Sequence, residues 1–374
     1  KKIELTFEQS NAYDTYSNML LNGGGSGLLY GVTGSGKTQV YLKLIDKALE
    51  NDRDVIVLVP EISLTPQVLS IFHARYGDKV AVFHSGLSLG ERNDEYKRAD
   101  RGEAKIVIGT RSAVFAPLHN LGLIIMDEEQ ENTYKSERTP KYNTKDVAHF
   151  RCKYNKALFL MTSATPSLEA YSNALKGKYV LCELNERFGD AKLPHVITVD
   201  MKQEMKNGNK SPISSKLKEL ISETIDNGKQ AILLINRRGY NTFIACNDCG
   251  HVITCPNCSI SLTYHSTNNR LTCHYCGYTK SLDNVCPECH SENIRYSGYG
   301  TQKIEDELSY LFPNARILRM DADTTSAKFS HEKLFNAFAN HEYDIMIGTQ
   351  MVAKGLDFDN VTLVGVVNAD NSLY

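Results

Sequence analysis

The stretch GVTGSGKT, at residues 31–38, fits the pattern GxxxxGK(S/T), in which a strand leads into a loop and the loop into a helix. The flanking sequence agrees with this pattern. The apolar run LLYG at 28–31 precedes the loop, and Val40, Leu44 and Ala48 follow it at helical spacing. A chance match in a glycine-rich turn is the alternative, and the strand–loop–helix context disfavours it. The stretch therefore predicts an α/β fold with a phosphate-binding loop.

This loop supplies the groups that ATP and Mg²⁺ require. Its glycines let backbone N–H groups surround phosphate oxygens, and the N-terminus of the next helix adds partial positive charge. Lys37 is expected to reach the β- and γ-phosphates, and the Thr38 hydroxyl is expected to bind Mg²⁺. The predicted ATP- and Mg²⁺-binding residues of the loop are Gly31, Thr33, Gly34, Ser35, Gly36, Lys37 and Thr38.

Two acids end another apolar run, LGLIIMDEE at 121–129. Charges belong at the solvent end of such a strand or on a metal, so Asp127 and Glu128 are expected at the ligand-binding edge of the sheet. Asp127 would hold Mg²⁺ through water, and Glu128 would position or deprotonate the attacking water. Two solvated acids at the start of a helix are the alternative, which the phosphate-binding loop disfavours. The predicted catalytic residues are thus Lys37, Asp127 and Glu128.

Apolar runs alternate with helical segments over most of the chain, which is typical of parallel sheets covered on both faces. The predicted boundaries are a first lobe at 1–190, a linker at 191–215 and a second lobe at 216–374, with an insertion at 246–290. The tract GGGSG at 23–27 resembles a flexible linker and is given no part in the fold. The predicted strands are LLYG (28–31), VIVLVP (55–60), VAVFH (80–84), KIVIGT (105–110), LGLIIMDE (121–128), ALFLMTSAT (157–165), AILLIN (231–236), ARILRMD (315–321), YDIMIGT (343–349) and VTLVGVV (361–367).

Composition excludes several classes of protein. Hydrophobic residues make up 41% and charged residues 23% of the 374, as in ordinary globular proteins, so disordered and fibrous folds are excluded. No apolar run approaches the roughly 18 residues of a membrane span, and KKIELTFEQ at 1–9 lacks the apolar core of a signal peptide. A cytoplasmic protein with no membrane partner is therefore expected. The net charge of −2 leaves nucleic acid open, because a binding groove needs only local positive charge.

Eight of the 10 cysteines form four CxxC knuckles, which in a reducing compartment indicate metal. Two knuckles together make the tetrahedral thiolate cage of structural zinc. The spacing favours nested pairing, because the long spacer at 259–272 suits a ribbon hairpin, whereas the short spacer between the first two knuckles would crowd a shared cage. The predicted zinc sites are Cys246, Cys249, Cys286 and Cys289 (zinc 1) and Cys255, Cys258, Cys273 and Cys276 (zinc 2).

An iron–sulfur cluster is the alternative occupant of these cages, since thiolates also hold iron. The other two cysteines, Cys152 and Cys182, are expected in the core. Four histidines near the knuckles are expected at the surface or beside the ligands, because eight thiolates already suffice. They are His251, His265, His274 and His290.

Several further stretches resemble the superfamily 2 helicases and, among them, the primosomal replication-restart helicase family. The resemblance runs through nearly the whole chain and implies two RecA-like parallel-sheet lobes, with a small zinc-binding module inserted in the second. It also implies the nested cysteine pairing and an adenine contact at Gln9. The stretches are LTFEQ (5–9), VLVPEISLTPQ (57–67), HSGLSLGER (84–92), IVIGTRSAVFAP (106–117), TSATPSLE (162–169), LLINRRGYN (233–241), CHYCG (273–277) and IMIGTQMVAKGLDF (345–358).

Three departures from this family bear on activity. The family reads DEEH where this chain has DEEQ at 127–130, and Gln130 can exchange hydrogen bonds but cannot become charged. Coupling between the lobes is expected to differ, whereas Mg²⁺ binding is not. The family's amino-terminal DNA-binding domains are missing, and the chain stops at NADNSLY (368–374), before the motif whose arginine completes the ATP site. A helicase fragment with weak ATP hydrolysis is therefore expected.

Motors on single strands need donors for phosphates and flat faces for bases. The segment 134–142 mixes both kinds of side chain and could report DNA occupancy to Glu128; a solvated loop with half-buried tyrosines is an equal alternative. Its candidate residues are Tyr134, Lys135, Arg138, Lys141 and Tyr142. The predicted DNA-binding residues elsewhere are Arg111, Arg237, Arg238 and Lys354.

The leading hypothesis is an ATP-dependent DNA helicase that uses ATP, Mg²⁺ and two Zn²⁺. By resemblance, it moves 3′ to 5′ on single-stranded and forked DNA at stalled replication forks, and is nucleoid-associated. The implied protein partners are other primosome proteins, single-stranded-DNA-binding protein and the replicative helicase loader. Two alternatives stay open: a DNA- and protein-binding primosome scaffold with negligible ATP turnover, and an RNA helicase, because the motor motifs do not read the sugar.

Overall fold

The structure is a computed structural model that describes residues 4–60, 66–84, 86–137, 139, 141–187, 194–209, 211–235, 242–246, 248–249, 251–265, 270–273, 275–281, 285–292, 294–297, 301–320, 330–349, 358–367 and 369. The chain divides into two compact units, Lys1–Val196 and Ile197–Tyr374. The division falls inside the predicted linker, 191–215, which contains the short helix α7 (Met201–Lys206). Among the helices within these ranges, none has the length and apolar composition of a bilayer span.

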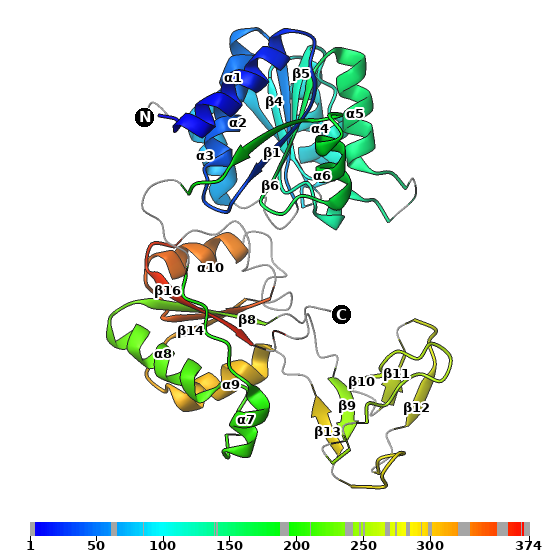
Figure 1. Ribbon diagram of the computed structural model, residues 1–374, viewed down its shortest axis with the longest axis vertical. Helices are drawn as coiled ribbons and strands as arrows, with labels where there is room; N and C mark the ends of the chain where they lie inside the picture. The colour runs from blue at the N-terminus through cyan, green and yellow to red at the C-terminus, as the bar shows by residue number, and fades with distance from the viewer. Residues whose placement is uncertain are drawn as a thin grey trace. The chain divides into compact units, whose positions relative to one another are not determined.

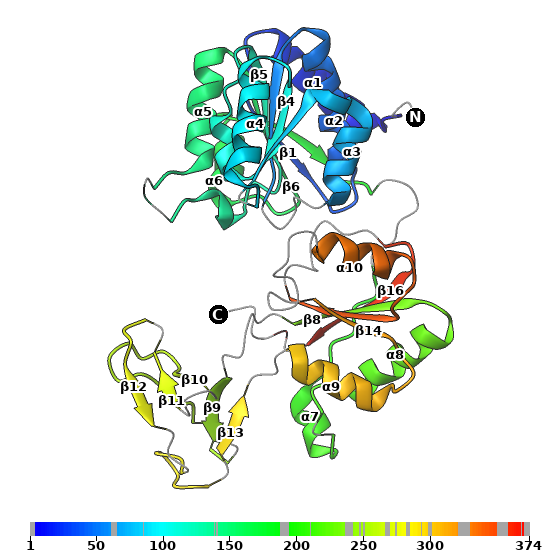
Figure 2. The same ribbon diagram turned by 180° about the vertical axis from the view of Figure 1, so that it is seen from behind.

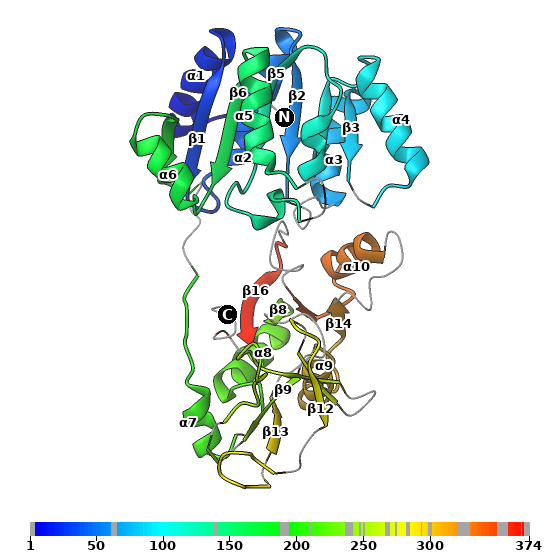
Figure 3. The same ribbon diagram turned by 90° about the vertical axis from the view of Figure 1, so that its right-hand side faces the viewer.

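Seven parallel strands form the sheet of the first unit. They are β1 (Gly25–Gly31), β2 (Asp54–Leu58), β3 (Val80–Phe83), β4 (Ile106–Gly109), β5 (Leu121–Met126), β6 (Leu158–Ser163) and β7 (Val180–Leu184). Their order is β3-β4-β2-β5-β6-β1-β7, and Figure 3 shows most of them side by side. The six predicted strands of this lobe are confirmed, and β7 is an addition at the sheet edge.

Helices cover both faces of this sheet (Figures 1 and 2). One face packs against α1 (Phe7–Leu21), α2 (Lys37–Glu50) and α3 (Pro66–Tyr76). The other packs against α4 (Leu89–Asp100), α5 (Thr144–Asn155) and α6 (Leu168–Leu175). Within β2, Val55 and Val57 enter the first core, whereas Ile56 and Leu58 enter the second. A strand buried on both faces has no polar alternation, which is why the sequence shows a continuous apolar run.

The tract GGGSG at 23–27 belongs to the fold, and its interpretation as a linker is wrong. β1 begins at Gly25 and pairs with both β6 and β7. Gly24 has a φ of +79°, and a Cβ there would lie 2.1 Å from the Ala157 carbonyl oxygen. A Cβ at Gly27 would lie 2.4 Å from the Tyr16 ring. The glycines therefore let the chain pass close to Ala157 and Tyr16, where a larger residue does not fit.

We expect Gly24→Ala to lower the free energy of unfolding by about 1–3 kcal/mol more than Gly23→Ala does, because only the former forces atoms into occupied space. Both positions have a positive φ, +79° and +99°, so the cost of a left-handed backbone is common to the two variants. At Gly23, however, a Cβ would meet nothing within 4 Å. Urea unfolding of the two variants measures the difference. Equal losses would contradict the close approach to Ala157.

The second unit has a parallel sheet of four strands in the order β14-β15-β8-β16. They are β8 (Gln230–Ile235), β14 (Ile317–Met320), β15 (Ile345–Gly348) and β16 (Val361–Val367), which confirms the four predicted strands of this lobe. One face packs against α8 (Ser215–Asp226) and α9 (Thr301–Leu311), and the other against α10 (Ser330–Ala339) (Figure 1).

A five-stranded antiparallel sheet carries the cysteine knuckles (Figure 2). Its strands are β9 (Thr242–Cys246), β10 (Thr263–His265), β11 (Arg270–Thr272), β12 (Thr279–Ser281) and β13 (Ile294–Ser297), in the order β12-β11-β10-β9-β13. β9 and β13 pair with each other, so the two ends of the predicted insertion lie together. Within the residues that the structure describes, its buried cluster is small and comprises Ile253, Cys255, Leu262, Leu271 and Cys273. A core of this size needs a further source of stability.

Candidate active site and metal centres

The loop between β1 and α2 presents backbone N–H groups at the start of α2. Gly36 is the N-cap residue in the left-handed conformation (φ +77°), and as a glycine it has no side chain to cap the helix. Gly34 also has a positive φ, +81°. The first helical turn therefore offers its N–H groups and its partial positive charge to an external anion.

Lys37 lies across this loop. Its Nζ donates to the carbonyl oxygens of Gly31 (2.7 Å) and Val32 (3.2 Å). Burial lowers the pKa of the Lys37 amine, while the charges of Glu128 and Asp127 act in the opposite direction. The amine thus sits between the loop and the two acids, where an anionic phosphate would favour its charged form.

The loop fits a phosphate group. Ser35 Oγ is buried and has no hydrogen-bond partner within the part of the chain that the structure describes, although buried hydroxyls normally have one. A Cβ at Gly36 would lie 2.4 Å from Gln9 Nε2, and one at Gly31 would lie 2.5 Å from Ser35 Oγ. Only glycines allow the backbone to adopt this closed loop. Burial raises the pKa of the Tyr41 hydroxyl, and the side chain of Thr38, the predicted Mg²⁺ ligand, opposes that rise.

Asp127 follows β5 and lies close to the loop. The Thr162 hydroxyl and the Glu128 N–H (3.1 Å) both donate to its Oδ1. Burial raises the pKa of the Asp127 carboxyl, and the hydrogen bond from Thr162 opposes that rise. A carboxylate held in this way beside a hydroxyl and a phosphate-binding loop is a suitable ligand for Mg²⁺.

Gln130 connects Glu128 to Ser163, the last residue of β6. Its Nε2 donates to Glu128 Oε2 (2.6 Å), and its Oε1 accepts from Ser163 Oγ (2.6 Å). Ser163 Oγ accepts in turn from the Thr165 N–H (2.9 Å). Glu128 itself has a φ of +49°, which is uncommon for a residue with a side chain and is typical of functional sites. Gln130, at the position where the resemblance leads one to expect histidine, therefore both donates and accepts.

Glu129 received no role from the sequence, yet it is the most buried of the three acids. Its side chain has an exposed fraction of 0% and forms an ion pair with Lys145 of α5. The Ser167 N–H donates to Oε1 (2.6 Å) and the Ser167 hydroxyl to Oε2 (3.1 Å). Ser167 is the N-cap of α6. Glu129 therefore joins the end of β5 to the starts of two helices, and no local sequence pattern marks this contact.

Gln9, the predicted adenine contact, is buried beside the phosphate-binding loop. Its Nε2 donates to the Ser35 carbonyl (2.9 Å), and its Oε1 accepts from the Thr6 N–H (3.0 Å). The second bond belongs to the capping box of α1. Gln9 thus braces the phosphate-binding loop against α1, and its contact with adenine stays a prediction.

Arg111 anchors the segment that follows the acids. Its Nη1 donates to the carbonyl oxygens of Thr133 (3.3 Å) and Lys135 (3.2 Å). Tyr134 lies between them and is buried, with its hydroxyl donating to the carbonyls of Leu58 (3.0 Å) and Asp127 (2.6 Å). Tyr134 is therefore tied to the acid pair and presents no flat face to a base.

The other predicted DNA contacts divide into two groups. Lys135 and Lys141 are exposed, and Tyr142 is half-buried with its ring 5.0 Å from that of Phe115, edge to face. The remaining candidates lie outside the described residues: Arg138, Arg237, Arg238 and Lys354. Binding of DNA at these positions stays a prediction.

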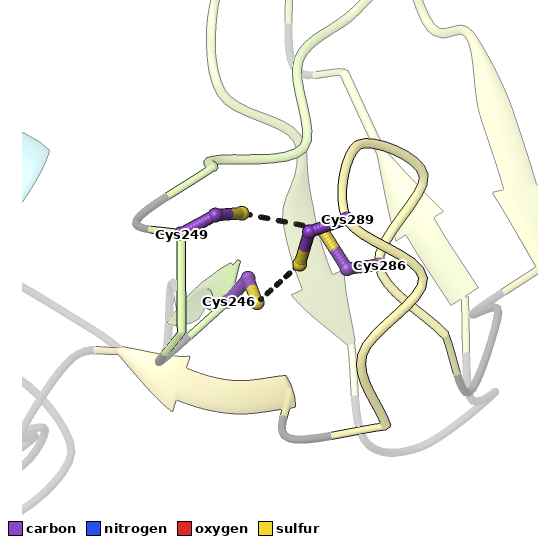
Figure 4. A group of neighbouring side chains, drawn as sticks. All are labelled: Cys246, Cys249, Cys286 and Cys289. Atoms are coloured by element: carbon purple, nitrogen blue, oxygen red, sulfur yellow. Dashed lines mark hydrogen bonds between the residues drawn. The ribbon is translucent and has the colours of Figure 1, made fainter.

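The eight knuckle cysteines gather into two sets of four. They are Cys246, Cys249, Cys286 and Cys289, drawn in Figure 4, and Cys255, Cys258, Cys273 and Cys276. Within each set the four sulfurs lie within 4.8 Å of one another, and the closest pairs are 3.5 and 3.6 Å apart. Zn–S bonds of about 2.3 Å in a tetrahedron place sulfurs about 3.8 Å apart, so each set fits one zinc ion. The structure thus brings together the two sets that nesting predicts.

All four knuckles share one backbone pattern. The N–H of the first cysteine donates to the carbonyl five residues later, as Cys246 does to His251 (2.9 Å) and Cys286 to Ser291 (2.8 Å). The turn directs backbone N–H groups at the sulfurs. A hydrogen bond from the Cys249 N–H lowers the pKa of Cys246 to about 7, and one from Tyr278 lowers the pKa of Cys276 to about 7. Thiolates, the form that binds metal, are favoured by such donors.

The spare residues lie outside these sets. His251 Nδ1 is 3.9 Å from Glu288 Oε2, which places both side chains beside the outer set. His265 ends β10, and His274 lies outside the described residues. Cys152 is buried in the core of the first unit, and Cys182 is half-buried against it.

Known protein families and structures match this arrangement. The DEAD/DEAH box helicase family matches residues 9–174. The chain resembles RecG bound to a three-way DNA junction with a TM-score of 0.53 at 18% identity, over 97% of this chain and 38% of that one. It resembles Mss116p bound to ssRNA and AMP-PNP with a TM-score of 0.56 at 16% identity, over 98% of this chain and 64% of that one. The fold and the site therefore define a helicase core with RecA-like lobes.

The particular family follows from closer relatives. Replication restart protein PriA of Bacillus subtilis (strain 168) is 53% identical over 93% of this chain and 43% of that protein, and that of Synechocystis sp. is 46% identical over 99% and 45%. The PriA DNA helicase Cys-rich region (CRR) domain matches residues 255–280. The chain belongs to the PriA family of replication restart proteins. It spans about half the length of the curated relatives it matches.

Proposed function

We propose that this chain is the ATP-driven motor of a DNA helicase that acts at stalled replication forks during replication restart. The observation that carries the proposal is that Lys37 lies beside a glycine loop and close enough to Glu128 and Asp127 for their charges to act on its pKa, in a chain 53% identical to a replication restart protein. When bound there, Mg²⁺ would neutralise charge on the phosphate oxygens. Thr38 and Asp127 would hold the metal ion.

Side chains and backbone groups of this chain then carry out the other steps of hydrolysis. Lys37 and the backbone N–H groups of the loop bind and orient the β- and γ-phosphates. Glu128, held by Gln130, positions the attacking water and accepts its proton. Gln130 also bonds Ser163, so the position of Glu128 depends on the loop after β6. This chain of contacts is a route by which hydrolysis and movement of that loop affect each other.

The same proposal specifies the nucleic acid and the protein partners. The protein would bind single-stranded and forked DNA and move along it 3′ to 5′, in the cytoplasm. Its protein partners would be other primosome proteins, single-stranded-DNA-binding protein and the replicative helicase loader. RecG, which shares the fold, is bound to a three-way DNA junction in its structure. Two structural zinc ions would hold the cysteine module.

A polypeptide of these 374 residues is expected to bind ATP–Mg²⁺ but to hydrolyse it about 10³-fold more slowly than a full-length relative. The phosphate-binding loop and the acids lie within the first unit, so binding needs nothing else. Charge on the γ-phosphate in the transition state is usually stabilised by an arginine from another segment, and the family's motif for it is absent from this sequence. Steady-state assays with the same DNA measure the ratio. Equal turnover would place that arginine within these residues.

Stimulation of this hydrolysis by oligonucleotides tests the class of protein. Single-stranded DNA should raise the rate of wild type and leave Lys37→Ala without measurable turnover. Stimulation by RNA to the same extent would instead support an RNA helicase. ATP binding with no stimulated turnover in a full-length relative would support a scaffold.

A further inference from the structure

Lys145 lies outside the predicted catalytic and nucleotide-binding sets, yet it contacts the run of acids. We propose that Lys145 is a positioning residue that ties the segment 135–143 to the loop 163–167 through the buried carboxylate of Glu129. The consequence for hydrolysis rests on the proposed function, whereas the contacts themselves do not.

The carboxylate of Glu129 is surrounded by donors. It receives the Lys145 ammonium and the N–H and hydroxyl groups of Ser167, and Lys145 Nζ is also 3.5 Å from Ser167 Oγ. Removing both charges from water is costly, so a buried ion pair of this kind contributes little net stability. Its effect is on geometry, because separation of the partners would leave a buried charge without compensation. Lys145, Glu129 and Ser167 are therefore held in one arrangement.

On one side of this junction, Lys145 is fixed to the segment 135–143. Asn143 caps α5 by accepting the Lys145 N–H at its Oδ1 (3.0 Å). Lys135 and Asn143 form an antiparallel bridge, and the Ser136 N–H donates to the Tyr142 carbonyl (2.8 Å). A displacement of this segment therefore displaces the lysine.

On the other side, residues 129 and 130 hold both ends of the loop 163–167, which runs from the last residue of β6 to the N-cap of α6. Gln130 binds Ser163 at one end, and Glu129 binds Ser167 at the other. Gln130 also bonds the predicted catalytic Glu128. Lys145 bonds Glu129 directly. A displacement of 135–143 is therefore transmitted to the loop 163–167 and, through Ser163 and Gln130, to Glu128. This arrangement is a mechanical link between an exposed basic segment and the water-positioning residue.

Hydrogen exchange on the full chain tests the link without reference to activity. Lys145→Met should speed exchange of the Ser167 amide and of amides in 136–143 about tenfold or more, because the buried carboxylate loses its counter-charge. Amides at 37–40 in α2 should not change. Lys145→Arg, which keeps the charge, should restore protection. Unchanged exchange, or an increase confined to the first turn of α5, would overturn the proposal.

A second readout separates coupling from simple loss of stability. In Lys145→Met/Glu129→Gln no buried charge remains, so protection at Ser167 should recover, whereas stimulation of hydrolysis by single-stranded DNA should stay about tenfold below wild type. Recovery of both properties would show that Lys145 only stabilises the fold. If wild type itself shows no DNA-stimulated hydrolysis, the proposed function fails, and the exchange experiment alone decides on the link.

Discussion

Lys37→Ala and Asp127→Ala are each expected to abolish measurable ATP hydrolysis, a loss of about 10²–10³-fold or more. Lys37 is the ammonium that lies across the phosphate-binding loop, bonded to Gly31 and Val32, and Asp127 is the half-buried carboxylate whose charge acts on it. Under the proposed function, the first variant loses a positive charge that would bind the phosphates, and the second loses a carboxylate that would hold Mg²⁺. Titration with a fluorescent ATP analogue and a phosphate-release assay measure binding and turnover separately.

Glu128→Gln separates chemistry from binding. This variant should lose turnover while binding ATP within about threefold of wild type, because the role proposed for Glu128 is on the attacking water and not on the nucleotide. Lys47→Ala is a matched control, since this lysine lies at the far end of the same helix and forms a surface ion pair with Glu50 at 3.6 Å. The assignment of roles is wrong if Glu128→Gln loses as much ATP affinity as Lys37→Ala.

Removal of zinc is expected to unfold the cysteine module and to leave both lobes folded. Each set of four sulfurs has the spacing of a zinc site, and the described residues of the module form only a small buried cluster. Structural zinc contributes apparent folding free energies of about 10–16 kcal/mol at neutral pH in small zinc domains, far more than such a core provides. Metal analysis should give two zinc ions per chain, and a chelator should abolish protection in 242–297 before that in β2 or β8.

Single substitutions should divide the module into two parts. Cys258→Ser removes the inner ion and should loosen the hairpin of β10 and β11, whereas Cys286→Ser removes the outer ion and should loosen the pairing of β9 with β13. Both variants should bind ATP normally, because the phosphate-binding loop lies in the first unit. Cys182→Ala, at a cysteine outside both sets, should keep two zinc ions. One ion per chain, or iron, would contradict the two-zinc prediction.

Much of the fold could be predicted from the sequence because its strands are buried on both faces. The run at 121–126 is apolar throughout, and the structure makes it β5, in the middle of the sheet. β7 was missed since it is an edge strand in which Val180 is exposed and only Leu184 is buried. The glycine tract misled for a different reason: its composition matches that of linkers, and only the approach to Tyr16 and Ala157 explains it.

The predictability of the site depended on local spacing. Lys37, Asp127 and the CxxC knuckles belong to short patterns in which one chemistry fixes the residue types. The ion pair between Glu129 and Lys145 belongs to no such pattern, because its partners come from separate elements that meet only in the folded sheet. Tyr134 shows the same limit. Nothing in the sequence distinguished a buried tyrosine that bonds the Asp127 carbonyl from a tyrosine at the surface.

The nested order of the cysteines has a consequence for synthesis of the chain on the ribosome. The inner set is complete once Cys276 has emerged, and its ends are close in sequence, so closing that loop costs less conformational entropy than closing the outer one. Cys246 and Cys249 emerge first but must wait for Cys286 and Cys289, and during that interval they are free thiols. A nascent chain that paused between these positions would expose them to oxidation or to capture of a metal by the wrong pair of knuckles. If the inner hairpin binds its ion first, only the four outer sulfurs are left to combine, which favours the nested pairing.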